Sequence, residues 1–340
     1  MTFLPPPARD SDPKTLILSS AEPDAVVASL LVARQAAHPP RRIYTDESRL
    51  AEALAHPVAQ RIEAGEVAVV GFAPLPGVAQ RLGRFLDDRP RLGLRVFDDH
   101  YWPSDDLAIL RRRLADEGRA IDPGAAFLVR LAWRTNGGDD VAERLVGLVD
   151  GSLPPDEAES WDAAWRRVLL ALRGDPSAIP RATEPLLAGR FVAPPEELRA
   201  LGDVVEEMVA DLETNSYHRF PIAGAEGVLI VAPARPVWPF RELAAHVRSR
   251  TGARFSLACF DGEPTAFLEW GRAALGRPAS ETTAPPDAPA LSEALRAVVR
   301  DDIRVRPWRR GEVVLDSGGA PFPPLVADLL PRLARVAAVF

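Results

Sequence analysis

The sequence predicts an α/β protein with two parts: an N-terminal doubly wound, mostly parallel sheet and a smaller C-terminal α/β domain with a mixed sheet. Two observations lead to this fold class. Short apolar runs alternate with helix-forming segments through the N-terminal part, which is the pattern of a parallel sheet. Farther along, Asp261 and Gly262 separate two apolar runs and are typical of a hairpin, which adds antiparallel strands.

The N-terminal elements follow in order. Apolar runs predict strands at 15–18, 42–45, 66–72 and 92–97. Apolar periodicity and helix-forming residues predict helices at 25–37, at 48–62, after a loop within 73–86, at 105–114 behind an N-cap at Ser104, and at 123–133.

The second half of the chain begins with a helix that carries Trp161 and Trp165 at helical spacing. Residues 175–195 are rich in Pro, Ala and Arg without a steady period, so we expect an irregular connection there, followed by a helix at 196–214. A strand at 227–233, a helix at 240–252 and the hairpin complete the chain. The expected division is 1–175, a helical linker at 176–220, and 221–340.

Composition excludes several classes of protein. With 340 residues, 47% apolar and 26% charged, the chain is long enough for two globular cores. It holds no apolar run of membrane-spanning length, and its start lacks the pattern of a secretory signal, so no membrane association is expected. Cys259 is the only cysteine, which fits a cytoplasmic protein. The net charge of −7 argues against a protein that coats nucleic acid non-specifically.

A cluster of ligand-type side chains follows the strand at 92–97. Asp98, Asp99 and His100 come directly after Phe97 in the stretch LRVFDDHYWP. The carboxyl ends of parallel strands are where such sheets bind ligands, and carboxylates beside an imidazole suit Mn²⁺ or Mg²⁺. The alternative is that the two aspartates begin a loop and that the acids after Ser104 charge the start of the next helix.

Other acids follow other predicted elements. Glu22 and Asp24 lie in the turn after the first strand, and Asp150 ends an apolar helix or strand in the stretch LVDG. Glu22 and Asp24 are equally explained as charges that favour a helix N-terminus, and Asp150 as a turn aspartate before Gly151.

The order of these features resembles the DHH phosphoesterase superfamily: an acidic turn, a strand ending in VVGF, then VFDDHYWP and LVDG. That group contains RecJ-type nucleases, oligonucleotide and pAp phosphatases, and the RecJ-related replisome subunit of archaea and eukaryotes. The resemblance implies a DHH domain joined to a smaller associated domain, and a centre of two Mn²⁺ ions that cleaves phosphoesters. It implies metal ligands at Glu22, Asp24, Asp98, Asp99 and Asp150, and catalytic roles for Asp98, Asp99 and His100.

The chain departs from the family pattern at Ser20, Gly71, Asp99 and Ala320. Ser20 and Asp99 stand where the family has histidines, and Gly71 stands where an aspartate bridges the two metals. Two cations about 4 Å apart need an anionic oxygen between them, which glycine cannot supply. The acids and His100 could still hold one hard ion weakly. Two-metal chemistry is therefore expected to be impaired.

Two segments of the C-terminal part are candidates for binding a phosphate-bearing ligand. Gly318 and Gly319 resemble the glycine-rich segment of the associated domain, with Ala320 at the place of its histidine. Arg306 and Arg309 flank Trp308 in RVRPWRRGE, and arginines beside an aromatic can track a phosphate backbone. The alternative is an edge strand whose arginines prevent pairing between sheets.

These observations support two main functions. The first is a degenerate, catalytically impaired protein that acts as a scaffold in DNA replication or repair, binding single-stranded nucleic acid or nucleotide phosphate and a protein partner of the replisome type. The second is a divergent but active Mn²⁺- or Mg²⁺-dependent phosphoesterase that uses one ion and acts on an oligonucleotide, pAp or pyrophosphate-type substrate. A third function, simple binding of a small anion or nucleotide, fits the same sequence features as the first.

Overall fold

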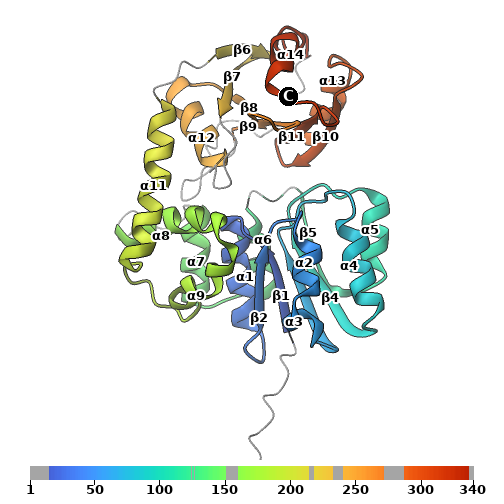
Figure 1. Ribbon diagram of the computed structural model, residues 1–340, viewed down its shortest axis with the longest axis vertical. Helices are drawn as coiled ribbons and strands as arrows, with labels where there is room; N and C mark the ends of the chain where they lie inside the picture. Colours follow the sequence, from blue (N-terminus) through green and yellow to red (C-terminus); the bar gives the residue numbers. More distant parts are fainter. Residues whose placement is uncertain are drawn as a thin grey trace, which may run out of the picture.

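The computed structural model describes residues 15–123, 125, 127–150, 160–213, 218–232, 240–271 and 287–336 (Figure 1). The start of the chain, Gly151, Thr214 and Pro233, on which parts of the predictions fall, lie outside the described residues. No helix in the described ranges combines the length and the apolar character needed to cross a bilayer.

The first sheet is parallel throughout, in the order β2-β1-β3-β4-β5. Its strands are β1 (Thr15–Ser20), β2 (Arg41–Thr45), β3 (Ala64–Val70), β4 (Arg91–Asp98) and β5 (Leu114–Ile121). The predicted α/β class is confirmed, and β5 is an additional strand that the sequence pattern did not predict.

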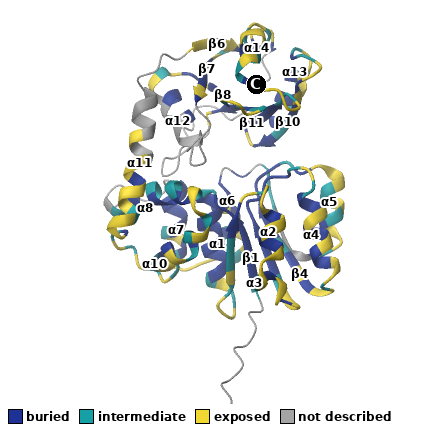
Figure 2. Ribbon diagram, viewed as in Figure 1, coloured by how far each residue is buried: buried dark blue, intermediate teal, exposed yellow. Residues whose placement is uncertain are grey.

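Helices cover both faces of this sheet. On β1, Ile17 faces the core formed with α1, α6 and α7, whereas Leu16 and Leu18 face the core formed with α2, α4 and α5. This alternation is the period of a strand with both faces buried, and Figure 2 shows buried strands between exposed outer helix surfaces. The helices are α1 (Pro23–Gln35), α2 (Leu50–Ala55), α3 (Pro57–Gln60), α4 (Val78–Asp87), α5 (Ser104–Arg111), α6 (Leu128–Asn136) and α7 (Asp140–Asp150).

The predicted helix at 105–114 is wrong at both ends. Ser104 is the first residue of α5, Pro103 precedes it, and the helix stops at Arg111. Leu114 begins β5, where its Cα partner is Leu94 of β4. The leucine that continues the helical spacing therefore belongs to the sheet core instead.

Two further helices differ from the predicted bounds. The segment at 48–62 is broken at Pro57, whose ring removes a backbone donor, so α2 ends at Ala55 and α3 begins at Pro57. The helix predicted at 123–133 runs from Leu128 to Asn136.

The segment at 175–195 is not irregular. It contains η2 (Pro176–Ala178), α9 (Ile179–Ala182) and α10 (Glu184–Leu187), which follow α8 (Ser160–Ala171) and η1 (Leu172–Gly174). Ile179, Ala182 and Leu186 lie in the same core as α1. Single turns of helix are too short to display a period, which explains why the sequence pattern misses them.

Helix α11 (Glu196–Glu213) leads to the second domain (Figure 1). The second sheet has the order β10-β11-β9-β8-β7-β6. Only β7 and β8 pair in parallel, so the predicted mixed sheet is confirmed, as is the hairpin between β8 and β9. The strands are β6 (His218–Ile222), β7 (Ala225–Ala232), β8 (Phe255–Phe260), β9 (Thr265–Trp270), β10 (Arg304–Arg309) and β11 (Glu312–Asp316).

The two faces of this sheet are covered differently. One face packs against α13 (Ala288–Arg296) and α14 (Val326–Leu333), and η3 (Pro323–Leu325) leads into α14. On the other face, α12 (Phe240–Thr251) covers β7 and β8. On the same face, Trp308 and Val314 form a small core with Ala73 of the first domain. Packing between the domains therefore completes the covering of this face.

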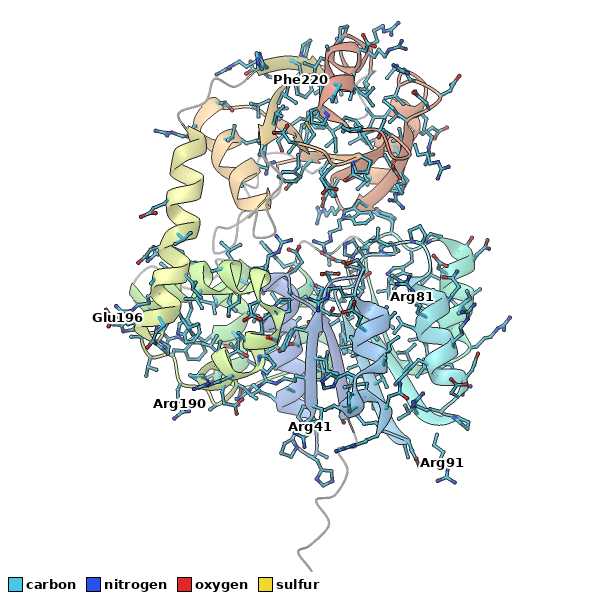
Figure 3. All side chains as sticks on the ribbon, in the orientation of Figure 1. Arg41, Arg81, Arg91, Arg190, Glu196 and Phe220 are labelled. Carbon is cyan, nitrogen blue, oxygen red and sulfur yellow. The ribbon has the colours of Figure 1, made fainter. Side chains whose placement is uncertain are left out.

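The orientation of the first sheet can be followed from its amino-terminal edge. Arg41 and Arg91 begin β2 and β4, and Figure 3 shows them on the side away from the second domain. The carboxyl ends of the parallel strands consequently face the second domain, which places strand-end side chains at the domain junction.

Candidate functional site

Asp98, Asp99 and His100 lie at the carboxyl end of β4 and are almost completely buried. The Nδ1 atom of His100 lies 2.7 Å from Oδ1 of Asp98, and the indole Nε1 of Trp102 donates to the other carboxylate oxygen. These bonds fix the ring orientation and leave Nε2 of His100 directed away from Asp98. Asp105 and Asp106 lie in the first turn of α5, where they favour the helix dipole.

Asp98, Asp99 and His100 are the one group in the described ranges that brings three metal-type ligand atoms within 4.8 Å of one another. Two carboxylates and an imidazole form a donor set that suits a hard divalent ion. The chemistry of the group therefore permits a metal, but the bonds already made by its atoms decide whether one fits.

Arg309, at the end of β10 in the second domain, reaches into this group. Its Nε atom donates to Nε2 of His100 at 2.7 Å and lies 3.0 Å from Oδ1 of Asp99. Arg309 is 5% exposed, so this is a buried ion pair rather than a surface contact. Both ring nitrogens of His100 are consequently engaged.

Neighbouring contacts hold the two domains together at this point. The backbone N–H of Tyr101 donates to the carbonyl of Trp308 at 2.9 Å. The rings of His100 and Trp308 meet edge to face, with centroids 5.1 Å apart. The site is therefore built from both domains.

Burial and charge shift the ionisation of the group. Burial raises the pKa of Asp98 above its usual value, and His100 opposes this shift. Burial lowers the pKa of His100, but the carboxylates of Asp98, Asp99 and Glu47 act the other way and leave it raised. Arg309 opposes protonation at Nε2, since its N–H uses the lone pair that a proton would take.

Glu47 is a site residue that the sequence reasoning passed over. It follows β2, and its Oε1 accepts a hydrogen bond from the backbone N–H of Ala73 at 2.7 Å. Burial raises its pKa, while its carboxylate interacts electrostatically with His100 and Glu22. The available signal was an acid shortly after a second parallel strand, at the edge where the other strand-end groups gather.

Ser20 and Gly71 lie beside this cluster. The N–H of Gly71 donates to the carbonyl of Phe97, directly before Asp98. A Cβ atom on Gly71 would lie 2.6 Å from the Cβ of Ala25, 2.8 Å from Cδ2 of Leu128 and 3.3 Å from Oγ of Ser20. Gly71 also has a φ of +68°, which other residues rarely adopt. The position has no room for a longer side chain.

The other predicted metal ligands have protein partners. The carboxylate of Asp24 accepts from the backbone N–H groups of Leu128 and Val129, at 2.8 and 2.7 Å, and so caps the start of α6. Glu22 pairs with Arg173 at 2.7 Å. Asp150 ends α7 and pairs with Arg130 on α6.

The predicted phosphate-binding residues occupy different places. Gly318 and Gly319 lie in an exposed turn that follows Asp316, the last residue of β11. Arg309 pairs with Glu312, at the opposite end of that strand. Arg306 lies over the ring of Trp308 at 5.5 Å. Strand β10 is an edge strand of its sheet, as the alternative interpretation expected.

No protein-family model and no curated protein matches this sequence. Several solved structures have a similar fold. One is the DHH domain of a member of the s1p family of ribosomal proteins, with a TM-score of 0.52 and 13% identity over 96% of this chain and 88% of that chain.

Two other structures are similar at lower TM-scores. Manganese-bound RecJ of Thermus thermophilus has a TM-score of 0.48 and 14% identity, over 97% of this chain and 52% of that chain. A pGpG-specific phosphodiesterase of Vibrio cholerae has a TM-score of 0.49 and 11% identity, over 95% of this chain and 99% of that chain.

The first of these similarities extends over both domains described above. At such low identity it concerns the fold and not the chemistry. The two-domain α/β fold of this chain is therefore similar to that of a DHH-domain structure, as the sequence resemblance predicted.

Proposed function

We propose that this chain is a DHH-fold protein that binds a phosphate-bearing ligand, either single-stranded nucleic acid or a nucleotide, and that it has lost two-metal hydrolysis. The observation that carries the proposal is the surrounding of Gly71. A pair of Mn²⁺ ions requires an anionic oxygen between them, and the bridging aspartate of the family corresponds to this position. Ala25 and Leu128 already fill the space that even its Cβ would need.

The contacts of the remaining acids support the same conclusion. Asp24 uses both carboxylate oxygens on backbone N–H groups, and Glu22 and Asp150 pair with arginines. Each acid thus has a structural role that a metal ion would have to displace. A two-metal centre therefore does not fit the residues present.

Support for an anionic ligand comes from Arg306. Its Nε atom is buried without a hydrogen-bond partner among the described residues, and its guanidinium lies over Trp308. An arginine above an aromatic ring can contact a phosphate while a base stacks nearby. Arg310, the exposed neighbour of Arg309, adds positive charge near Tyr101.

The test is binding of a labelled single-stranded oligonucleotide, measured by fluorescence anisotropy at several salt concentrations. Arg306→Ala should weaken binding and reduce the slope of log K against log salt by about 0.7, the value for one contact with a single strand. Arg91→Ala removes an exposed arginine at the opposite edge of the first sheet and should leave the slope unchanged. Equal slopes for both variants would contradict the proposed binding surface.

The loss of hydrolysis has its own test. Purified protein is incubated with Mn²⁺ and a short oligonucleotide, pAp or pyrophosphate, and we expect no turnover above that of a heat-denatured sample. Robust Mn²⁺-dependent hydrolysis that Asp98→Asn abolishes would overturn this half of the proposal.

A second candidate function is a one-metal phosphoesterase. The observation that favours it is the close approach of Asp98, Asp99 and His100. Those three residues would hold a single Mn²⁺ or Mg²⁺, which would supply charge stabilisation to a phosphoester. Unchanged turnover after substitution of Asp98 would rule this function out.

A scaffold role in DNA replication or repair, with a protein partner of the replisome type, extends the proposal on the strength of the sequence resemblance. The test is the sensitivity of cells lacking the chain to DNA damage. Wild type should restore resistance and Arg306→Ala should not. Full rescue by that variant would separate the cellular role from the proposed ligand surface.

A further inference from the structure

A β-bulge in β10 directs the side chain of Arg309 toward the first domain. The register of β10 against β11 shifts between Pro307 and Arg309, so the strand gains a residue at Trp308. Bulges turn side chains away from the direction that regular alternation would give. Here Trp308 and Arg309, although adjacent in sequence, are both buried at the domain junction.

Arg309 stands at the end of a row of buried polar side chains on its own sheet. Ser256, Glu269, Glu312 and Arg309 are successive partners across β8, β9, β11 and β10, so they share one face. Arg248 belongs to α12, which packs on this face, and it donates to Oγ of Ser256 at 2.6 Å. Glu269 pairs with Arg248 at 3.4 Å. Glu312 is the cross-strand partner of Arg309, and its negative charge lowers the cost of burying the guanidinium.

On the other side, Arg309 meets the atoms that would bind a metal. A ligand histidine uses one ring nitrogen on the metal and the other on a carboxylate. The Nδ1 of His100 is held by Asp98, which leaves Nε2, and Nε2 accepts from Arg309. The Oδ1 of Asp99 is 3.0 Å from the same guanidinium atom. A cation bound by Nε2 and Asp99 would need the volume that Arg309 fills.

We propose that Arg309 takes the place of a metal ion in this cluster, and that its contacts with His100 and Asp99 hold the second domain against the first. Its charge repels a divalent ion from Asp99 and His100. Because Arg309 belongs to the second domain, neutralisation of the cluster requires the domains to be closed. The inference concerns domain geometry and goes beyond the proposed function, since it holds whether or not nucleic acid binds.

The first experiment measures Mn²⁺ binding by electron paramagnetic resonance, which reports the loss of the free-ion signal. Wild type should bind weakly or not at all. Arg309→Met should bind one ion per chain at least about tenfold more tightly, because the competing charge is gone. Adding Asp99→Asn to this variant should abolish the gain. Arg304→Met, an exposed arginine on the same strand, should behave as wild type.

The second experiment measures the distance between the domains with spin labels on introduced cysteines. Arg81 on α4 and Glu293 on α13 are exposed, and the single native cysteine is buried. Wild type and Arg304→Met should give one narrow distance distribution, whereas Arg309→Met should broaden it. Arg309→Met with the binding and the distances of wild type would overturn the inference.

A charge-keeping variant covers the case in which Arg309→Met does not fold. Arg309→Lys retains the positive charge but cannot reproduce the planar Nε donor. It should bind Mn²⁺ more tightly than wild type but less tightly than Arg309→Met, while the distance distribution broadens. A narrow, wild-type distribution in this variant would show that the bond from Nε to His100 does not hold the domains together.

Discussion

The Nε atom of Arg309 lies 2.7 Å from Nε2 of His100, although 209 positions separate the two residues in the chain. The contact joins β10 of the second domain to the end of β4 in the first. Because Arg309 donates and Nε2 accepts, the imidazole in this arrangement carries its proton on Nδ1, facing Asp98. The cluster therefore acts as an acceptor site for a guanidinium.

The pairing of Arg309 with Asp99 should be measurable as a coupling energy. Urea unfolding of Arg309→Met, Asp99→Asn and the double variant forms a double-mutant cycle. We expect a coupling of about 1 to 3 kcal/mol, since the pair is buried and in direct contact. Arg304 and Asp316 are cross-strand partners on the same two strands, and as a more exposed pair they should couple by less than about 0.5 kcal/mol. Equal coupling in both cycles would contradict the buried ion pair.

Introducing an acid at Gly71 should destabilise the protein rather than create a metal centre. Gly71→Asp places a Cβ 2.6 Å from that of Ala25, on a backbone with a φ of +68°. We expect a loss of about 3 kcal/mol or more in the free energy of unfolding, from overpacking and backbone strain together.

A matched glycine separates these two causes. Gly262 also has a positive φ, +79°, but no atom lies within 4 Å of its hypothetical Cβ. Gly262→Ala should therefore cost about 1 to 2 kcal/mol from the backbone alone, and Gly71→Ala should cost more because of Ala25 and Leu128. Gly71→Asp with wild-type stability and two bound Mn²⁺ ions would contradict this explanation.

The sequence predicts the first sheet because its central strands are continuous apolar runs between helices. The same pattern in the sequence alone places Asp98, Asp99 and His100 at the end of a strand. It fails at β5, since Leu114–Ile121 contains charged residues and a glycine and has no strand period. There, pairing with β4 overrides the weak local preference.

The sequence could not predict that Arg309 is the residue that contacts Asp99 and His100. RVRPWRRGE predicts a basic strand, in which Arg309 is a candidate either for contacting a phosphate backbone or for protecting a sheet edge. Which arginine enters the first domain depends on a bulge at Trp308 and on how the domains close, and both are long-range properties. Glu47 was missed for a similar reason: its burial depends on Ala73, which follows a different strand.

Trp308 should determine whether the two domains unfold together. Its ring packs with Ala73 and Val314 and meets the edge of His100. Trp308→Ala removes most of this contact while leaving each domain's own core in place. We expect a single calorimetric transition to split into two, with a loss of about 3 to 5 kcal/mol in total. Trp270→Ala, in the core of the second domain, should lower that domain's transition directly, so matching profiles for the two variants would argue against a junction role.

Cys259 should be unreactive in the folded protein. Burial raises the pKa of this thiol to about 12, and the nearby charge of Asp261 adds to the shift. Thiolate is the reactive form, so at pH 8 a disulfide reagent should label native protein far more slowly than protein unfolded in urea. Because Cys259 is the only cysteine, the labelling rate reports opening of the second domain. Rapid labelling of the native state would contradict its buried position.

The same shift predicts how stability depends on pH. A thiol whose folded pKa is raised above its unfolded value does not affect stability at neutral pH. As the pH rises from the ordinary thiol pKa toward about 12, the unfolded chain releases a proton that the folded chain keeps, so stability falls. The fall is at most about 1.4 kcal/mol per pH unit. Urea unfolding at pH 8 and pH 10 should show a smaller decrease for Cys259→Ala than for wild type, and identical decreases would mean that Cys259 ionises as readily in the folded protein as in the unfolded chain.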